Sequence, residues 1–361
     1  MIPSIIDGLN VKDVKAVFDT YTLTDFAFPT LFPLEFTPSL TWESLSGSEG
    51  SPVAADVVSY DSTAPRKIRE VLSKASGDIP KIAIAREKNE KDMNKYNQLR
   101  RYADDGAKQA LTKWIWEDQE FVYKGVNARL EYNALRGAST GKLALSKTNN
   151  DGGLVTEFAV DFQIPTANKS GVSVVINVAN AATSKPITKI KSIVNAAKAK
   201  GVKLPYIFTD QATVDNVLVS AETLSITASW VAQATNLTQT PTLPSLNTAL
   251  SGLGLPRIIV IDSYITLEIA SVRTQVAPWE AGVMLFSDQP TLGNTYYSSL
   301  ADEMVDSTTS IKVKRGHVLI KRFANEEPLR ETVLAMANAM PVISGVANKY
   351  LVDTLATSWS K

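Results

Sequence analysis

Residues 111–137, LTKWIWEDQEFVYKGVNARLEYNALRG, decide how the rest of the chain is organised. At about 100° per residue, the apolar side chains of this stretch share a stripe roughly 120° wide, which predicts a long helix with one buried face. The stripe consists of Leu111, Trp114, Ile115, Phe121, Val122, Val126 and Tyr132. Trp116 and Tyr123 lie outside it, so we expect them at a boundary with another strand layer or a second subunit. The highly charged residues before 111 extend the predicted helix to about 84–136.

The region before this helix contains two segments that need an outside surface. Residues 25–36, DFAFPTLFPLEF, hold four phenylalanines and two prolines, and the prolines exclude a long helix. We therefore predict that Phe26, Phe28 and Phe32 anchor an extended N-terminal arm on another surface, which makes them candidate subunit contacts. The alternative is a strand tucked into the chain's own core.

Residues 39–83 follow as a predicted two-stranded excursion, in which Gly, Ser and Pro clusters alternate with short β-branched runs. An excursion of this length has few core contacts of its own, so we expect an external surface to stabilise it. Its basic cluster APRKIRE, at 64–70, has acids nearby and favours charge pairing between subunits over nucleic-acid recognition. The candidate subunit contacts here are Trp42, Tyr60, Arg66, Lys67, Arg69 and Glu70.

After the helix the pattern becomes α/β. Short apolar runs bounded by turns alternate with amphipathic helices between about 172 and 310, as in LPYIFTD followed by QATVDNVLVSAE. GVSVVINVA at 171–179 is predicted to be a further strand of this block. The alternating residues of 138–165 are expected to pair with those of 309–324, which would make the α/β block an inserted domain.

The composition excludes several classes of function. Lys plus Arg and Asp plus Glu both number 37, so the chain has no overall charge with which to coat nucleic acid or a membrane. There is no cysteine, which removes thiolate chemistry and disulfides. We find no signal peptide and no apolar run long enough to span a bilayer, and we expect folding in a cytoplasm.

The sequence contains no set of residues whose spacing is typical of a catalytic or ligand-binding site. The single histidine, His317, lies in a basic alternating strand and is interpreted as a surface or interface residue. Gly137 to Lys142 resembles a phosphate loop but follows a helix and has three spacers between its glycines, so we interpret it as a helix stop. We therefore predict no catalytic, metal-binding or cofactor-binding residue, no cofactor, and no enzyme.

The order of parts resembles the major capsid proteins of tailed bacteriophages with the HK97 fold, specifically the lambda-like capsid protein E branch. The stretches that carry the resemblance include ADVVSYDSTAPRKIREVLSKASGDIPKIAIAREKNEKDM, QEFVYKGVNARLEYNALRGASTGKLAL and GVMLFSDQPTLGNTYYSSLADE. The resemblance implies an α+β fold with an N-terminal arm (1–38), an extended loop (39–83), a peripheral domain with a spine helix (84–171), an axial domain (172–308) and return strands (309–361).

The resemblance also implies a function. It predicts a structural shell subunit that forms hexamers and pentamers, works with a portal and a separate scaffolding protein, accepts a decoration protein in some shells, and encloses double-stranded DNA that it contacts weakly. Such a protein is assembled in the bacterial host's cytoplasm and ends in the virion, with no membrane contact. Two alternatives remain open: an encapsulin-like compartment shell, and a small-molecule enzyme with Asp210 or Asp262 at a strand end.

Overall fold

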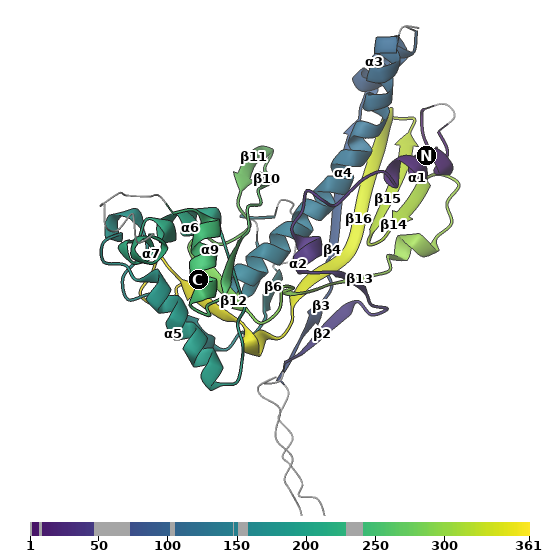
Figure 1. The fold of residues 1–361 in the computed structure, drawn as a ribbon. Coiled ribbons are helices and arrows are strands. Elements are labelled where there is room, and N and C mark those ends of the chain that lie inside the picture. Colours follow the sequence, from purple (N-terminus) through teal and green to yellow (C-terminus); the bar gives the residue numbers. More distant parts are fainter. Residues whose placement is uncertain are drawn as a thin grey trace, which may run out of the picture. The chain divides into compact units, whose positions relative to one another are not determined.

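The computed structural model describes residues 2–6, 9–46, 73–101, 105–146, 148–150, 158–228 and 241–361. The chain forms two compact units (Figure 1). The first comprises Met1–Trp42, Gly77–Asn133 and Thr295–Pro341, and the second comprises Glu43–Ser76, Ala134–Asn294 and Val342–Lys361. Both units are therefore built from segments that are far apart in the sequence.

The first unit is organised around a mixed sheet in the order β1-β13-β16-β15-β14, with β4 also paired to β16. The strands are β1 (Leu34–Phe36), β4 (Lys81–Lys88), β13 (Gly293–Ser298), β14 (Ile311–Arg315), β15 (Val318–Asn325) and β16 (Arg330–Ile343). Strand β16 pairs antiparallel with both β4 and β15, whereas β1 and β13 run parallel. The prediction that 309–324 pairs with 138–165 is wrong, because β14 and β15 form a hairpin with each other.

Four helices belong wholly or partly to the first unit: α1 (Val11–Phe18), α2 (Phe28–Leu31), α3 (Glu90–Arg101) and α4 (Asp105–Thr140). Helix α4 has 36 residues and is about 54 Å long; its residues from 134 onward belong to the second unit. It ends where Gly141 takes the left-handed φ of 72°, which confirms the predicted helix stop. From Val122 onward most of its residues are buried, so the single apolar stripe describes only part of the helix.

The start of the helical region differs from the prediction. Residues 81–88 form strand β4, and helix α3 begins after Asn89, whose side-chain oxygen accepts hydrogen bonds from the N–H groups of Lys91 and Asp92. Gly125 lies on the side of α4 that faces β4. A Cβ there would lie 2.7 Å from a methyl carbon of Ile84, so the glycine lets α4 lie close against β4.

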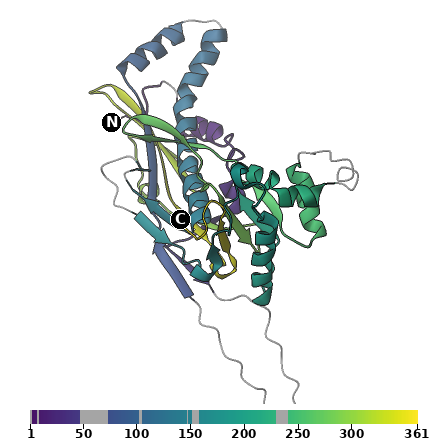
Figure 2. The ribbon, with the colours of Figure 1, turned by 90° about the vertical axis from the view of Figure 1, so that its left-hand side faces the viewer.

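The described residues of the second unit contain a sheet in the order β7-β17-β12-β8-β9, flanked by four helices. The strands are β7 (Lys169–Ser170), β8 (Tyr206–Thr209), β9 (Arg257–Val260), β12 (Val283–Ser287) and β17 (Tyr350–Asp353), and the helices are α5 (Pro186–Ala199), α6 (Gln211–Leu218), α7 (Ala221–Thr227) and α9 (Leu243–Gly252). One apolar cluster joins these helices to the sheet, and β12 is buried along its whole length. Figure 2 shows the same elements from the side.

Paired strands and short 3-10 turns complete the described chain. The pairs are β2 (Thr41–Ser46) with β3 (Ser73–Asp78), β5 (Lys142–Leu145) with β6 (Phe158–Asp161), and β10 (Ile265–Ile269) with β11 (Val272–Val276). The 3-10 turns are Thr166–Asn168, Val178–Asn180, Ala301–Met304 and Val346–Asn348. The strand predicted at 171–179 is absent: within it, Val172 and Ile176 donate backbone hydrogen bonds to Ala356 and Thr354, outside any named strand.

Candidate subunit-contact site

The N-terminal segment of the first unit is held by an aromatic cluster on α4. Phe18, the last residue of α1, lies edge-on to Tyr123 with ring centroids 5.2 Å apart, and Tyr21 stacks on the same ring at 5.5 Å. Arg315 of β14 donates hydrogen bonds from Nη1 to the carbonyl oxygens of Phe18, at 2.6 Å, and Tyr21. Burial raises the pKa of both tyrosines, so their hydroxyls stay neutral. The cluster therefore fixes the end of α1 on its own chain.

A second anchor is the buried carboxylate of Glu131 in α4. It accepts hydrogen bonds from the backbone N–H groups of Ala27, at 3.1 Å, and Phe28, at 2.7 Å. These groups open the short helix α2 and have no partner within that helix, so the carboxylate satisfies them and is itself satisfied. Phe28 and Phe32, at either end of α2, are fully buried. The N-terminal segment is thus tied down by contacts more than 100 residues apart in the sequence.

The structure corrects the contact prediction for four candidates. Phe28, Phe32, Trp42 and Tyr123 expose at most 3% of their surface, because their own chain encloses them, and this leaves no side-chain surface for a second subunit. The Trp42 indole, for instance, lies against Gly77, where a Cβ would come within 3.0 Å of the ring nitrogen. The alternative of a segment tucked into the chain's own core describes residues 18–32 better than a free arm does.

Of the seven remaining candidates, two have accessible surface and five lie outside the described residues. Phe26 and Trp116 are partly exposed and remain predicted contacts. Tyr60, Arg66, Lys67, Arg69 and Glu70 lie outside the described residues.

The structure adds an exposed apolar segment that the sequence analysis did not select. Leu34, Phe36 and Leu40 expose 37%, 53% and 56% of their surfaces and follow directly on the buried Phe32. Phe36 touches Tyr297 edge-on, with centroids 5.5 Å apart, and β1 pairs through one edge with β13. No other strand among the described residues pairs with β1. We call residues 34–40 the exposed edge segment; the alternation of Leu34 and Phe36 after a proline was its signal in the sequence.

The interpretation of His317 as a surface residue is wrong. Its side chain is 3% exposed, its Nε2 lies 3.0 Å from Oδ1 of Asn127, and its ring is edge-on to Phe28. Burial lowers the pKa of His317 to about 4, so the ring is neutral near pH 7. With Asn127 as acceptor, Nε2 carries the proton. The histidine is therefore a packing residue of the N-terminal anchor.

Two buried ion pairs of the first unit join one strand to another and a strand to α4. Arg322 and Glu331, on the neighbouring strands β15 and β16, are paired at 2.5 Å and both are fully buried. Lys88 of β4 is paired with Asp118 of α4, both with 7% of the side chain exposed. Burial lowers the pKa of Lys88, and the hydrogen bond and charge of Asp118 oppose that shift. These pairs are structural, because each charge is already met by its partner.

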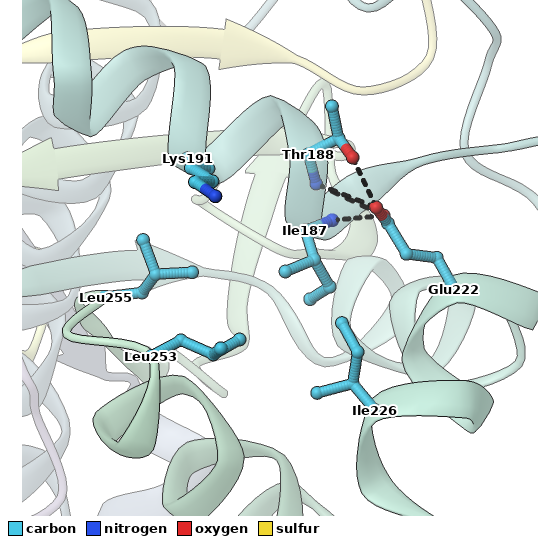
Figure 3. Close-up of a pocket in the computed structure, with 7 residues that line it drawn as sticks. All are labelled: Ile187, Thr188, Lys191, Glu222, Ile226, Leu253 and Leu255. Atoms are coloured by element: carbon cyan, nitrogen blue, oxygen red, sulfur yellow. Dashed lines mark hydrogen bonds between the residues drawn. The ribbon is translucent and has the colours of Figure 1, made fainter.

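The second unit contains a hollow between α5, α7 and the residues after α9 (Figure 3). Its volume is about 240 Å³, and it is lined by Ile187, Thr188, Lys191, Glu222, Ile226, Leu253 and Leu255. The Glu222 carboxylate accepts hydrogen bonds from the N–H of Ile187, at 2.7 Å, and of Thr188, at 3.1 Å, and so caps α5 (Figure 3). Its carboxylate is engaged as a helix cap, and Lys191 is the other titratable lining residue.

The described residues do not form a metal centre or a membrane-spanning helix. In the described part of the chain, no group of His, Cys, Asp or Glu side chains is arranged to hold a metal ion. No helix of the described residues is long and apolar enough to cross a membrane. Asp210, considered above as a possible site residue, caps α6 by accepting from the N–H of Thr213 at 3.2 Å.

Comparison with known proteins identifies the class as phage capsid proteins. The family described as phage major capsid protein E matches residues 43–345. The chain therefore belongs to the phage major capsid protein E family. No curated protein has a sequence that matches the chain.

Two solved structures show the same fold. One is assigned as the capsid protein of a prophage of Escherichia coli CFT073; it is 13% identical, with a TM-score of 0.58 over 96% of this chain and 99% of that chain. The other is a phage-related protein of Bordetella bronchiseptica RB50; it is 11% identical, with a TM-score of 0.51 over 95% of this chain and 96% of that chain. The HK97-like capsid fold predicted from the sequence is confirmed.

Membership of this family defines the role of the chain. It is a structural protein of the capsid of tailed phages, and it is not an enzyme. Its place is in the virion. The enzyme alternative is therefore excluded by the family assignment.

Proposed function

We propose that this chain is the main shell subunit of an icosahedral phage head, and that it assembles as hexamers and pentamers around a double-stranded DNA genome. The proposed assembly takes place in the cytoplasm of a bacterial host. The proposed partners are further copies of this chain, a portal and a separate scaffolding protein, with a decoration protein as an optional addition. Packaged DNA would be contacted weakly and without sequence preference.

The exposed edge segment is the observation that supports subunit contact best. Leu34 and Phe36 lie on β1, which has one edge without a partner strand among the described residues, and Leu40 follows four residues after Phe36. Scattered exposed apolar residues, by contrast, are common on any protein. A strand edge with apolar side chains is a surface on which another chain can pair. The fully buried Phe28 and Phe32, a few residues earlier, hold this segment in place. Its apolar side chains therefore have a fixed position on the surface of the subunit.

The energy available from such a contact is enough to matter for assembly. Burying an exposed Leu or Phe side chain contributes about 1.5 to 3 kcal/mol. Because the side chains are only partly exposed, Phe36 and Leu40 together would contribute roughly half of the full value for two residues, or about 1.5 to 3 kcal/mol per subunit. This contribution would recur at every equivalent contact of a shell.

The experiment compares two double variants of the full-length chain. Phe36→Ser with Leu40→Ser should abolish or strongly reduce shell formation, measured by sedimentation velocity and negative-stain microscopy, while thermal unfolding of the subunit changes little. The control is Val178→Ser with Val272→Ser, which removes two isolated side chains that are 70% and 64% exposed. Normal shells from the first variant would refute the proposed contact, as would equal loss of assembly in both variants.

A further inference from the structure

One stretch of the second unit departs from the charge balance of the chain. Residues 162–209 contain seven lysines and no aspartate or glutamate, although acidic and basic residues are equal in number over the whole chain. Six of these lysines lie on or next to α5: Lys185, Lys189, Lys191, Lys198, Lys200 and Lys203. We call this set the lysine face. It was not recognised from the sequence, where the run APRKIRE drew attention instead, but the absence of acids over 48 residues was a readable signal.

The lysines are placed at the edges of the outward side of α5. The inner side of the helix is buried in the apolar cluster through Ile187, Ile190, Ile193, Val194 and Ala197. At 3.6 residues per turn, Lys185 and Lys189 fall along one edge of the buried stripe and Lys191 and Lys198 along the other. The exposed side between these two rows carries only small or uncharged polar residues, namely Thr188, Ser192, Asn195, Ala196 and Ala199.

One charge of this face is used inside the chain, because Nζ of Lys200 lies over the ring of Tyr350, 5.4 Å from its centroid. Within the described residues, none of the six lysines forms an ion pair with a carboxylate. Lys200 is hydrogen-bonded to the neutral Oδ1 of Asn168 at 3.0 Å. Glu222, the acid nearest in the hollow, is occupied by the N–H groups that open α5.

Helix stability accounts for Lys198, in the last turn of α5, but not for the charges at the start of the helix. Lys185 is the N-cap residue of α5 and Lys189 lies one turn later, at the end of the helix where the macrodipole disfavours positive charge. The helix has no acid of its own in its first turn. Apart from Lys200, the lysine face is therefore a concentration of positive charge that no carboxylate of the described residues neutralises.

We infer that the lysine face binds the phosphate backbone of duplex DNA, without reading its sequence. Helix α5 has 14 residues and is about 21 Å long, and duplex DNA carries one phosphate charge per about 1.7 Å of its axis, so roughly twelve phosphates can lie alongside. The small residues between the two rows of lysines let the helix approach a rigid rod closely. Lysine acts on phosphate as a point charge, which suits contact without sequence preference.

This inference rests on the proposed function, because a shell that encloses a genome brings a surface of each subunit against DNA. It adds a specific statement, namely that the α5 side of the second unit faces the packaged DNA. An acidic segment of a partner protein is the competing ligand, and the experiment separates the two.

The test measures binding of a fluorescent duplex of about 30 base pairs to the unassembled full-length chain by anisotropy over a series of salt concentrations. The variant Lys189→Gln/Lys191→Gln/Lys198→Gln should bind at least tenfold more weakly at about 50 mM salt, and the slope of log K against log salt should fall by about 2.7, which is 0.9 for each of three lysines. Ser192→Glu, which places a negative charge between the rows, should also weaken binding.

A matched control removes three exposed lysines from the first unit, in the variant Lys91→Gln/Lys95→Gln/Lys113→Gln. It carries the same change of charge and should bind DNA within about twofold of the wild type. Equal weakening by both triple variants, or no binding by the wild type at low salt, would overturn the inference. Tight binding of a polyglutamate peptide in place of DNA would assign the face to an acidic protein segment instead. Shell formation by the lysine-face variant, followed by sedimentation, tests the capsid function separately.

Discussion

The interiors of the two units bury different kinds of side chain. The first unit encloses Arg322 with Glu331, Lys88 with Asp118, and the carboxylate of Glu131. The second unit is built around one large cluster of apolar residues from its helices and sheet. It has a buried pair as well, Lys349 with Asp288 on the edge of that cluster, but its lysines on α5 stay at the surface without acidic partners.

The difference shows what buried charge does in this molecule. Glu331 also accepts hydrogen bonds from the Ser4 hydroxyl, at 2.8 Å, and from the N–H of Ile5, at 3.3 Å, so the pair with Arg322 positions the start of the chain. Polar contacts fix a geometry more narrowly than apolar packing, although they add little to net stability. We interpret the first unit as the one that fixes the N-terminal segment, and the second as a stable support for a charged face.

Breaking the buried pair of the first unit should have the largest effect on stability. Glu331→Gln leaves the Arg322 charge buried without a counter-charge, and we expect a loss of about 3 to 5 kcal/mol in the free energy of unfolding by urea. The exposed pair of Arg273 with Glu268 gives the control: Glu268→Gln should cost less than about 1 kcal/mol. Similar costs for the two variants would contradict the role given to the buried pair.

A cavity in the core of the second unit should rank next. Leu246 of α9 is fully buried in the apolar cluster, and Leu246→Ala should lower the free energy of unfolding by about 2 to 4 kcal/mol. Leu253, seven residues later, is 55% exposed, and Leu253→Ala should change the same quantity by less than about 0.5 kcal/mol. If both substitutions were neutral, the cluster would not be the core of this unit.

Acid should weaken the N-terminal anchor of the first unit through His317. The pKa of His317 falls from 6.5 in the unfolded chain to about 4 in the fold, because burial disfavours the charged ring. Between these values the unfolded chain binds more protons than the folded chain, so stability decreases as the pH falls from 6.5 toward 4. At 1.36 kcal/mol per pH unit, the loss at about pH 5 is roughly 2 kcal/mol.

The measurement is urea unfolding at several pH values between neutrality and about pH 5, with His317→Gln as the comparison. The variant keeps a hydrogen-bond donor but does not titrate in this range, so its stability should depend less on pH by the same roughly 2 kcal/mol. Identical pH dependence in the two proteins would show that other groups are responsible.

The smallest expected effect on folding is that of Trp116. It is partly exposed, so Trp116→Ala should change the free energy of unfolding by about 1 kcal/mol or less while it reduces shell formation measured by sedimentation. The buried Trp42 provides the contrast within the same unit, since Trp42→Ala should cost about 3 to 5 kcal/mol of subunit stability. Normal shells from the Trp116 variant would remove this residue from the contact candidates.

Local patterns in the sequence predicted much of the second unit. The strand β8 and the helix α6 both follow from the short-range periodicity of residues 204–222. The same reasoning missed β4, because the charged residues Arg86, Glu87 and Lys88 hide the alternation of Ile82 and Ile84. Asn89, a helix cap, marked the true boundary.

The N-terminal anchor could not be predicted in this way. Its contacts join Glu131 to Ala27 and Phe28, and Asn127 to His317, which are about 100 and 190 residues apart. The periodicity of a short segment carries no information about partners so far away in the sequence. The sequence alone therefore could not distinguish phenylalanines buried in the chain's own core from phenylalanines exposed to a neighbouring subunit. The exposed edge segment could be distinguished from the buried residues before it only once the burial of Phe28 and Phe32 was known.

The most direct test of the central claim is negative-stain electron microscopy of the purified full-length chain, expressed alone and together with a scaffolding protein. We predict uniform closed particles in at least one of these conditions, with sedimentation velocity showing capsomers or shells. A chain that stays monomeric or forms only small oligomers under all these conditions would contradict the account of a self-assembling shell subunit.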